Sequence, residues 1–319
     1  MNRRKILFII LATILLILFY ILGYFLIPIN TKQNLKLPSS NGNEIINYLK
    51  DKNYSVNFLD SLYLKFLTTP RKGWIYINKK TLPRYKFLNQ VGGYANHYTP
   101  ITIIPGETTY FVIKMLSKKL NFSIKDLIYA YKQNAIYSEG NFLANTYNIP
   151  IYFKEKDTID FLIKNSLKEY KKLSITYLNS FDKAQWKKIL IIASIIQKEA
   201  ANNKEMPIIA SVIYNRLKKN MKLQMDGSLN YGKYSHTKIT PQRIKTDNSF
   251  YNTYKHKGLP KEPVCNVSKN AIIATLKPAK TNYLYFMRNS NGTHNFSKEY
   301  KKHIINIKKR KRYIKELKK

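Results

Sequence analysis

Glu199 is the residue of this chain whose position best suits acid–base chemistry. It closes an isoleucine-rich run in the stretch "ASIIQKEA", residues 193–200. On a helical period of 3.6 residues it stacks over Ile196, Ile195 and Ile192, which places it on the apolar face. Burial and the negative end of the helix dipole both disfavour a charged carboxylate there. A carboxyl group that stays protonated near neutral pH is what a general acid requires. The alternative is an ordinary solvated carboxylate after an apolar run.

The two residues before Glu199 occupy other positions on the same helix. Lys198 stacks over Ser194 and Lys187, on the polar side. Gln197 lies roughly 160° around the helix from Glu199 and therefore cannot exchange protons with it. Among these three neighbours, only Glu199 is a candidate acid.

Two helices and a turn are expected to position this acid. The first helix should begin near Asp182 and run to about Ala200, and Asn203 can cap a second helix over "KEMPIIASVIYNRLKK". Pro207 is tolerated in the first turn of that helix, where backbone N–H groups lack partners. An extended segment and a turn at Asp226-Gly227 should follow.

Aromatic residues alternate with Asn, Gln, Thr and His in the later part of the chain. The stretches are "MKLQMDGSLNYG", "FYNTYKHKGLP", "LKPAKTNYLYFM" and "NGTHNFS". Ring faces that stack on sugars and amides that meet hydroxyl groups would suit a glycan-binding groove. A Tyr-rich surface without a ligand gives the same composition.

Composition limits the class of protein. The chain has 319 residues, enough for two or three small domains, and 44% of them are hydrophobic, which excludes general disorder. The single Cys265 has no partner for a disulfide and cannot build a zinc site alone, and we expect neither a metal nor a cofactor. A formal charge of +38 predicts anionic surroundings such as nucleic acid, an acidic membrane or wall polymer. Coding bias toward Lys, Asn and Ile is the competing explanation.

The N-terminus predicts a membrane anchor. Ile6 to Ile27 is uncharged and long enough to cross ~30 Å of hydrocarbon, and Arg3, Arg4 and Lys5 should hold its start in the cytoplasm. The exit "FLIPINTKQ" lacks the small residues of a signal-peptide cleavage site. We therefore expect a permanent single-pass anchor with residues 31–319 outside the cytoplasm. No nucleic acid is expected there, so the charge points to wall polymer and the membrane surface.

The expected fold class is α+β, in five parts. Residues 1–30 form the cytoplasmic N-terminus and the anchor, and residues 31–97 an extracytoplasmic α/β region with a short helix in "NEIINYLKDKNYSV" and a strand at "GWIYI". Residues 98–153 predict a strand, two helices from about Thr108 and Ser123, and a strand at "NIPIYF". This βααβ unit resembles a LysM module, although a subdomain that only orients its neighbour fits too. A mixed α+β catalytic domain, 154–303, and a basic tail, 304–319, complete the chain.

Residues 185–303 closely resemble the catalytic domain of the endolytic murein transglycosylases, the MltG or YceG-like family. The pieces in family order are "ASIIQKEA", "ASVIYNRLKKNMKLQMDGSLNYG", "YNTYKHKGLP", "PAKTNYLYF" and "GTHNFS". Members commonly carry Glu-Lys-Glu where this chain has Gln197, Lys198 and Glu199, so the acid of an active site here must be Glu199. Glu262 and Cys265 are lesser departures that concern fine substrate contacts.

The resemblance implies a lyase that cuts the β-1,4 bond between N-acetylmuramic acid and N-acetylglucosamine within nascent peptidoglycan strands and limits strand length. Glu199 would act as acid and then base, leaving 1,6-anhydro ends without water. Asp226 would position substrate, or serve as the second acid of a hydrolase. Gln224, Asn215 and Tyr254 are proposed glycan contacts. We read Asn252, Gly258 and Pro260 as turn residues.

The anchor predicts an inner-membrane enzyme with its catalytic domain in the periplasm. The resemblance implies partners in the wall-synthesis machinery such as penicillin-binding proteins. A non-catalytic peptidoglycan-binding scaffold is the alternative function, and it would not need an acid at position 199. A nucleic-acid binder would explain the tail "KKRKRYIKELKK", but it conflicts with the anchor. We read that tail as a basic helix near anionic lipid or wall polymer.

Overall fold

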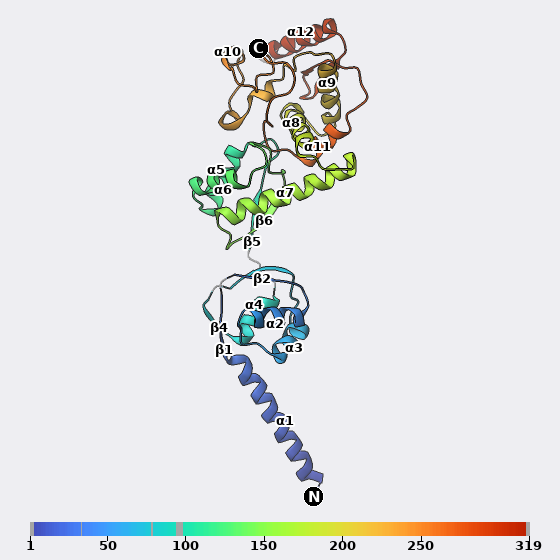
Figure 1. Cartoon of the computed structure of the whole chain (residues 1–319). Helices are drawn as coiled ribbons and strands as arrows, with labels where there is room; N and C mark the ends of the chain where they lie inside the picture. The colour runs from blue at the N-terminus through green and yellow to red at the C-terminus, as the bar shows by residue number, and fades with distance from the viewer. Residues whose placement is uncertain (1–2, 33, 78, 94–97, 317–319) are drawn as a thin grey trace. The chain divides into compact units, whose positions relative to one another are not determined.

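The computed structural model describes residues 3–316 except 33, 78 and 94–97 (Figure 1). Two compact units make up the chain. The N-terminal unit is Met1–Thr99 with Asn148–Tyr152, and the C-terminal unit is Pro100–Tyr147 with Phe153–Lys319. We describe each unit by itself.

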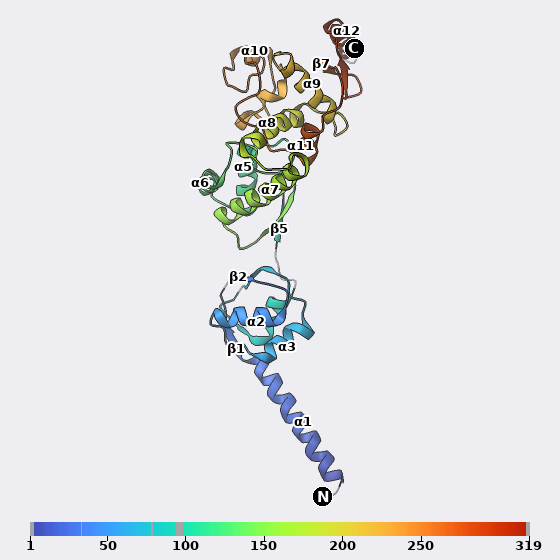
Figure 2. The same cartoon turned by 45° about the vertical axis from the view of Figure 1, so that its right-hand side comes forward.

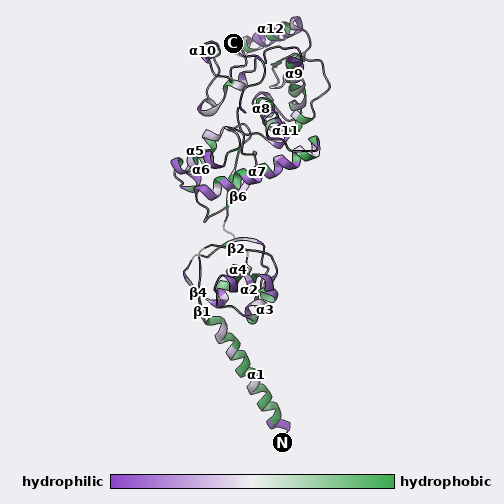
Figure 3. Cartoon of the chain, viewed as in Figure 1, coloured by the Kyte–Doolittle hydropathy of each residue, from purple (hydrophilic) through white to green (hydrophobic). Residues whose placement is uncertain are grey.

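The first helix, α1 (Arg3–Leu26), contains the predicted anchor. Its most apolar 18-residue stretch has a mean hydropathy of 3.0, and none of the 24 residues of the helix is buried in the protein. At ~1.5 Å per residue the helix is long enough to cross a bilayer. Hydrophobic colouring covers nearly its whole length (Figure 3). Length and composition thus make α1 a candidate membrane span.

The rest of the N-terminal unit packs three helices against two small antiparallel sheets. Ile29 of one sheet lies opposite Leu82, and Leu35 of the other lies opposite Ile75, and all four side chains are buried. The predicted helix and the predicted "GWIYI" strand are both present. The elements are β1 (Pro28–Asn30), β2 (Asn34–Leu37), α2 (Gly42–Asp51), α3 (Phe58–Leu67), β3 (Gly73–Tyr76), β4 (Thr81–Pro83) and α4 (Arg84–Gly92).

The order strand–helix–helix–strand expected over 98–153 is present. Its elements are β5 (Tyr98–Thr102), α5 (Thr109–Leu120), α6 (Ile124–Asn134) and β6 (Thr146–Pro150), with β5 paired to β6. Ser123 caps α6 by accepting a hydrogen bond from the backbone N–H of Asp126 at 3.3 Å. The last strand ends at Pro150, because the chain turns at the next residues instead of extending to Phe153. The likeness to a LysM module stays a prediction.

Residues 98–153 share a core with residues further along the chain. Helix α7 (Glu155–Leu178) packs on α6. Tyr137 and Leu143 belong to the same hydrophobic cluster as Trp186 and Ile195, and the Tyr137 hydroxyl donates to the Lys183 carbonyl at 2.9 Å. The predicted boundary between 153 and 154 therefore does not separate two compact bodies.

The centre of the C-terminal unit consists of α8 (Lys183–Glu199), α9 (Met206–Lys218) and α11 (Lys269–Leu276) (Figure 2). As predicted, α8 begins next to Asp182, and the Asp182 carboxylate caps it by accepting a hydrogen bond from the Gln185 N–H at 2.7 Å. The prediction that Asn203 caps α9 is wrong. Glu205 holds the cap position and its side chain makes no cap bond, because that carboxylate binds elsewhere.

The remaining elements follow α9 along the chain, and the first of them contacts α8. Two 3₁₀ turns and a short helix follow α9, namely η1 (Asp226–Leu229), η2 (Gly232–Tyr234) and α10 (Pro241–Thr246). An antiparallel hairpin of β7 (Tyr285–Arg288) and β8 (His294–Ser297) packs against α12 (Tyr300–Glu316). The basic C-terminal segment is thus helical as far as Glu316, and residues 317–319 of the predicted tail lie outside the described part.

Candidate active site

Glu199 is the last residue of α8, and its carboxylate contacts the following turn. Its Oε1 accepts a hydrogen bond from the Gly227 backbone N–H at 2.6 Å. A Cβ on residue 227 would lie 2.9 Å from this oxygen and 2.5 Å from the Lys198 Cβ. Position 227 therefore needs glycine, because η1 approaches the end of α8 too closely for a side chain.

The environment raises the pKa of Glu199 to about 7. Burial is the largest cause, and the charge of Asp226 acts in the same direction. The Gly227 N–H and the positive charge of Arg216 oppose them. Because the pKa is near neutral, this carboxyl group can either donate or accept a proton at physiological pH.

Glu199 opens into a pocket of about 480 Å³, which we call the Glu199 pocket. Gln224, Asp226 and Tyr254 also line it, so four of the five site residues expected from the sequence come together here. The fifth, Asn215, does not line the pocket. Its Nδ2 donates to the carbonyls of Thr281 at 2.8 Å and Tyr283 at 3.0 Å, which ties α9 to the segment before β7.

Gln224 has an unusual backbone conformation. Its φ is +49°, in the left-handed region that non-glycine residues seldom adopt. Its N–H donates to the Thr253 carbonyl at 3.1 Å, and its neighbours Leu223 and Met225 are buried. Such a backbone places the Gln224 side chain, which is exposed, at the pocket while its neighbours stay in the core.

Asp226 and Tyr254 form a hydrogen-bonded pair in the pocket. The Tyr254 hydroxyl donates to Asp226 Oδ1 at 2.6 Å. Burial first, then this hydrogen bond and the charge of Asp226, raise the pKa of Tyr254 above its ordinary value. The phenol therefore stays protonated and fixes the orientation of the Asp226 carboxylate.

Arg216 holds the pocket together, a role that sequence reasoning missed. It is 7% exposed, and its guanidinium donates to the carbonyls of Leu284 at 2.6 Å and Leu223 at 2.6 Å. The same group lies 5.3 Å from the centre of the Tyr285 ring. Arg216 thus joins α9, β7 and the segment that carries Gln224. Its place near the end of a helix gave no signal for these long-range contacts.

His294 is a second residue that the sequence did not assign. It lines the Glu199 pocket, and its Nδ1 lies 2.8 Å from Glu205 Oε2, while its backbone N–H donates to Glu205 Oε1 at 2.7 Å. Burial alone would raise the pKa of Glu205, but these two hydrogen bonds and the charge of His294 hold it below its usual value. The Glu205 carboxylate beside Nδ1 fixes the orientation of the His294 ring at the pocket.

The basic C-terminal helix forms one wall of the pocket. Tyr300, His303, Ile307 and Arg310 of α12 line it, together with Arg288 at the end of β7. Arg216, Arg288 and Arg310 make the surroundings of the pocket electropositive, which suits an anionic ligand.

Some residues singled out from the sequence, and metal binding, play no part in the Glu199 pocket of the described residues. No group of three or more His, Cys, Asp or Glu side chains there could hold a metal ion. Glu262 forms an ion pair with Lys187, and the buried Cys265 thiol contacts the Ser194 carbonyl at 3.6 Å. Neither residue lines the Glu199 pocket.

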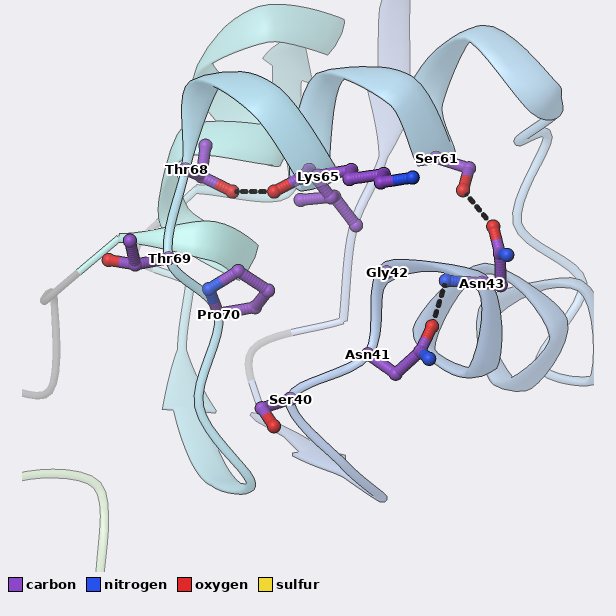
Figure 4. A pocket seen from close by; sticks show the side chains of 10 residues that line it. Ser40, Asn41, Gly42, Asn43, Ser61, Lys65, Thr68, Thr69 and Pro70 are labelled. Atoms are coloured by element: carbon purple, nitrogen blue, oxygen red, sulfur yellow. Dashed lines mark hydrogen bonds between the residues drawn. The ribbon is translucent and has the colours of Figure 1, made fainter.

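A second polar pocket, of about 400 Å³, lies in the N-terminal unit between the start of α2 and the end of α3 (Figure 4). Asn41 caps α2 there, and Ser61 donates to Asn43. Hydroxyl and amide groups line it along with Lys65, but no carboxyl group does. It therefore offers no carboxylic acid for proton transfer.

Fold and site together define a mixed α+β protein whose pocket holds one carboxyl group set for proton transfer. The chain belongs to the YceG-like family, whose sequence pattern matches residues 38–309. It is similar to the crystal structure of a yceG-like protein from Listeria monocytogenes, with a TM-score of 0.55 and 25% identity over 86% of this chain and 99% of that one.

A curated relative carries a functional name. The chain is 30% identical over 154 residues to a Bacillus subtilis protein named endolytic murein transglycosylase. The match covers 47% of this chain and 43% of the relative, so the chain spans less than half of that protein's length. The name supports a transglycosylase role at the level of the family.

Proposed function

We propose that this chain is a membrane-anchored endolytic peptidoglycan lytic transglycosylase, a lyase that cuts nascent glycan strands internally and limits their length. The observation that carries the proposal is the Glu199 carboxyl group, whose pKa is about 7 and which lines a pocket together with Asp226, Gln224 and Tyr254. Membership of the YceG-like family supports it.

The reaction needs one group that gives a proton and then takes one back. Protonated Glu199 donates to the glycosidic oxygen between N-acetylmuramic acid and N-acetylglucosamine as the C1–O4 bond breaks. The resulting carboxylate accepts the proton of the muramoyl 6-hydroxyl as O6 closes on C1. The product is a 1,6-anhydro end, Glu199 is protonated again, and no water is consumed.

The other pocket residues take supporting roles in this proposal. Asp226, held by Tyr254, and the Gln224 amide position the sugar through hydrogen bonds. Asn215 acts indirectly, because its amide nitrogen holds the segment before β7. The arginines around the pocket favour the carboxylates of muramic acid and its peptide. A hydrolase would instead use Asp226 as a second acid with a water molecule.

Place and partners complete the proposal. With α1 in the inner membrane, the C-terminal unit works on the periplasmic side, where strands are being extended. The LysM-like unit, residues 98–153, assists glycan binding. Penicillin-binding proteins of the wall-synthesis machinery are the proposed partners.

Product analysis tests the reaction type. Full-length protein in detergent micelles is incubated with uncrosslinked glycan strands, and the new ends are identified by mass spectrometry. We expect 1,6-anhydromuramoyl ends, and none with Glu199→Gln. Reducing ends, one water heavier, would refute the lyase and make Asp226 a catalytic partner. Binding without cleavage by the wild type would favour the non-catalytic scaffold.

A further inference from the structure

Helix α3 buries two polar residues and leaves most of its apolar residues exposed or partly exposed. Its buried residues are Asp60, Ser61 and Leu64. Phe58, Phe66 and Leu67 are exposed to 69%, 71% and 69%. The partly exposed Leu59, Leu62 and Tyr63 fill the gaps between them, so a continuous apolar stripe faces outward. A soluble surface helix shows the reverse arrangement, and an exposed stripe of this kind marks a binding surface.

The stripe continues onto the candidate membrane helix. The rings of Phe25 in α1 and Tyr63 in α3 are 5.0 Å apart. Leu22 and Leu26 of α1 line an apolar hollow of about 710 Å³ together with Tyr63 and Leu67 of α3. The lipid-facing surface expected for α1 and the exposed face of α3 therefore form one apolar surface.

A buried polar cluster fixes α3 in this orientation. Arg84 Nη1 lies 2.8 Å from Asp60 Oδ2, and the Tyr24 hydroxyl donates to the same carboxylate oxygen at 2.7 Å. The Arg84 and Asp60 side chains are 4% and 0% exposed. Turning α3 to bury its apolar stripe would break this ion pair, which is strongly unfavourable for buried charges. The same cluster joins α1 to α3 and α4.

The charge around α3 suits an anionic surface. Residues 28–99 contain three acidic residues, Glu44, Asp51 and Asp60, against eleven Lys and Arg. Lys65 projects from α3 beside the stripe, with its Nζ 5.3 Å from the Phe66 ring. An ammonium group beside exposed aromatic rings is the pattern of a helix that lies at the headgroup level of a membrane.

We propose that α3 lies in the outer interface of the same bilayer that α1 crosses, with acyl chains covering Phe58, Phe66 and Leu67. Lys65 then reaches the anionic headgroups. The N-terminal unit is held against the membrane at two places, α1 and α3, and does not swing from α1 alone. This inference rests on the proposed anchoring by α1.

Depth measurements on the full chain in vesicles containing anionic lipid test the inference. In a Cys265→Ala background, one nitroxide label is placed at Phe66→Cys, at Leu15→Cys within α1, or at Glu44→Cys on the exposed side of α2. The ratio of relaxation by oxygen, which partitions into lipid, to relaxation by a water-soluble nickel chelate reports depth. We expect the ratio at position 66 to exceed that at position 44 at least fivefold and to stay below that at position 15, which lies near the middle of α1.

The labels separate failure of this inference from failure of the anchor. Equal ratios at positions 66 and 44, with position 15 deep in lipid, would overturn the docking of α3 and leave the anchor intact. A water-exposed label at position 15 would overturn both. A third outcome is a label at position 66 that neither oxygen nor the nickel chelate reaches, with spectral broadening between labels that disappears when unlabelled protein is added. That outcome would show a second copy of the protein covering α3, and it would overturn the inference.

Discussion

Replacing Glu199 with Gln should stabilise the protein at alkaline pH while abolishing cleavage. In the folded chain the pKa of Glu199 is about 7, against 4.5 for an unperturbed carboxyl. A raised pKa means that the folded state holds the proton more tightly than the unfolded chain does. As pH rises from about 4.5 to 7, the unfolded state ionises first, and the folded state loses stability relative to it.

The size of this loss follows from the two pKa values. At roughly 1.4 kcal/mol per pH unit, the difference between 4.5 and about 7 corresponds to about 3 kcal/mol above pH 7. Glutamine keeps the shape of the side chain and an oxygen that accepts from the Gly227 N–H, but it does not ionise. Glu199→Gln should therefore be up to ~3 kcal/mol more stable than the wild type at pH 8, and nearly equal to it at pH 4.5.

Urea unfolding of the full chain in detergent micelles at both pH values measures this difference. Trp186 is fully buried in the core that holds α8, so its fluorescence reports the C-terminal unit when Trp74→Phe is present in all proteins. Glu139, whose pKa is also about 7 because of burial, contributes equally to both proteins and cancels. Glu299→Gln, which removes an exposed carboxylate of the same unit, is the matched control and should show no gain that depends on pH.

The rate of cleavage should follow the same ionisation. The protonated fraction of Glu199 falls from about half at pH 7 to about a tenth at pH 8, so kcat/KM should drop about fivefold between them. A cleavage rate that stays constant from pH 6 to pH 8.5, together with no gain of stability in Glu199→Gln, would refute the assignment of this carboxyl as the buried acid.

Three further substitutions test the surroundings of Glu199. Gln197→Glu should leave the cleavage rate unchanged and raise the free energy of unfolding by ~0.5 kcal/mol. The side chain of residue 197 accepts hydrogen bonds from Ser268 at the start of α11, where a negative charge is favourable. A large gain of activity would make position 197 catalytic. Gly227→Ala should displace the Glu199 carboxylate and lower kcat by about 100-fold with unchanged circular dichroism. The control is Gly258→Asn, at a position with left-handed backbone and open space around it, and this variant should stay active. Glu205→Gln should lower kcat about tenfold with little change of KM, because His294 loses the charged partner that orients its ring in the pocket. An unchanged kcat would show that the Glu205–His294 pair does not contribute to cleavage.

Local patterns were enough to predict the helix that carries Glu199. The isoleucine period sets the buried face of α8, and the Asp182 cap lies three residues from the N–H that it binds. The position of Gln197 away from Glu199 follows from the same period, and its carbonyl is used by Ser268. These features depend only on residues that are close together in the sequence, so they can be predicted from the sequence alone.

Features that depend on distant partners could not be predicted in this way. The Glu205–His294 pair joins positions 89 residues apart, so no local pattern around Glu205 indicates it. Asn215 was expected to contact the glycan, but its amide nitrogen donates to two backbone carbonyls near β7 and so connects two parts of the fold. A single sequence shows that these side chains are polar, but the tertiary fold decides which of them face the pocket.

The pKa of Glu199 is a balance between opposing contacts, and the proposed reaction depends on that balance. The same carboxyl must release a proton to one oxygen and take a proton from another, so a pKa far from the working pH would impede one of the two steps. Burial and Asp226 favour the protonated form, while the Gly227 N–H and the charge of Arg216 favour the carboxylate. Burial without these two would raise the pKa further, and the carboxyl would release its proton less readily. Arg216 therefore has two consequences for Glu199, since its hydrogen bonds hold the pocket walls and its charge adds to the larger effect of the Gly227 N–H in lowering the pKa of the acid.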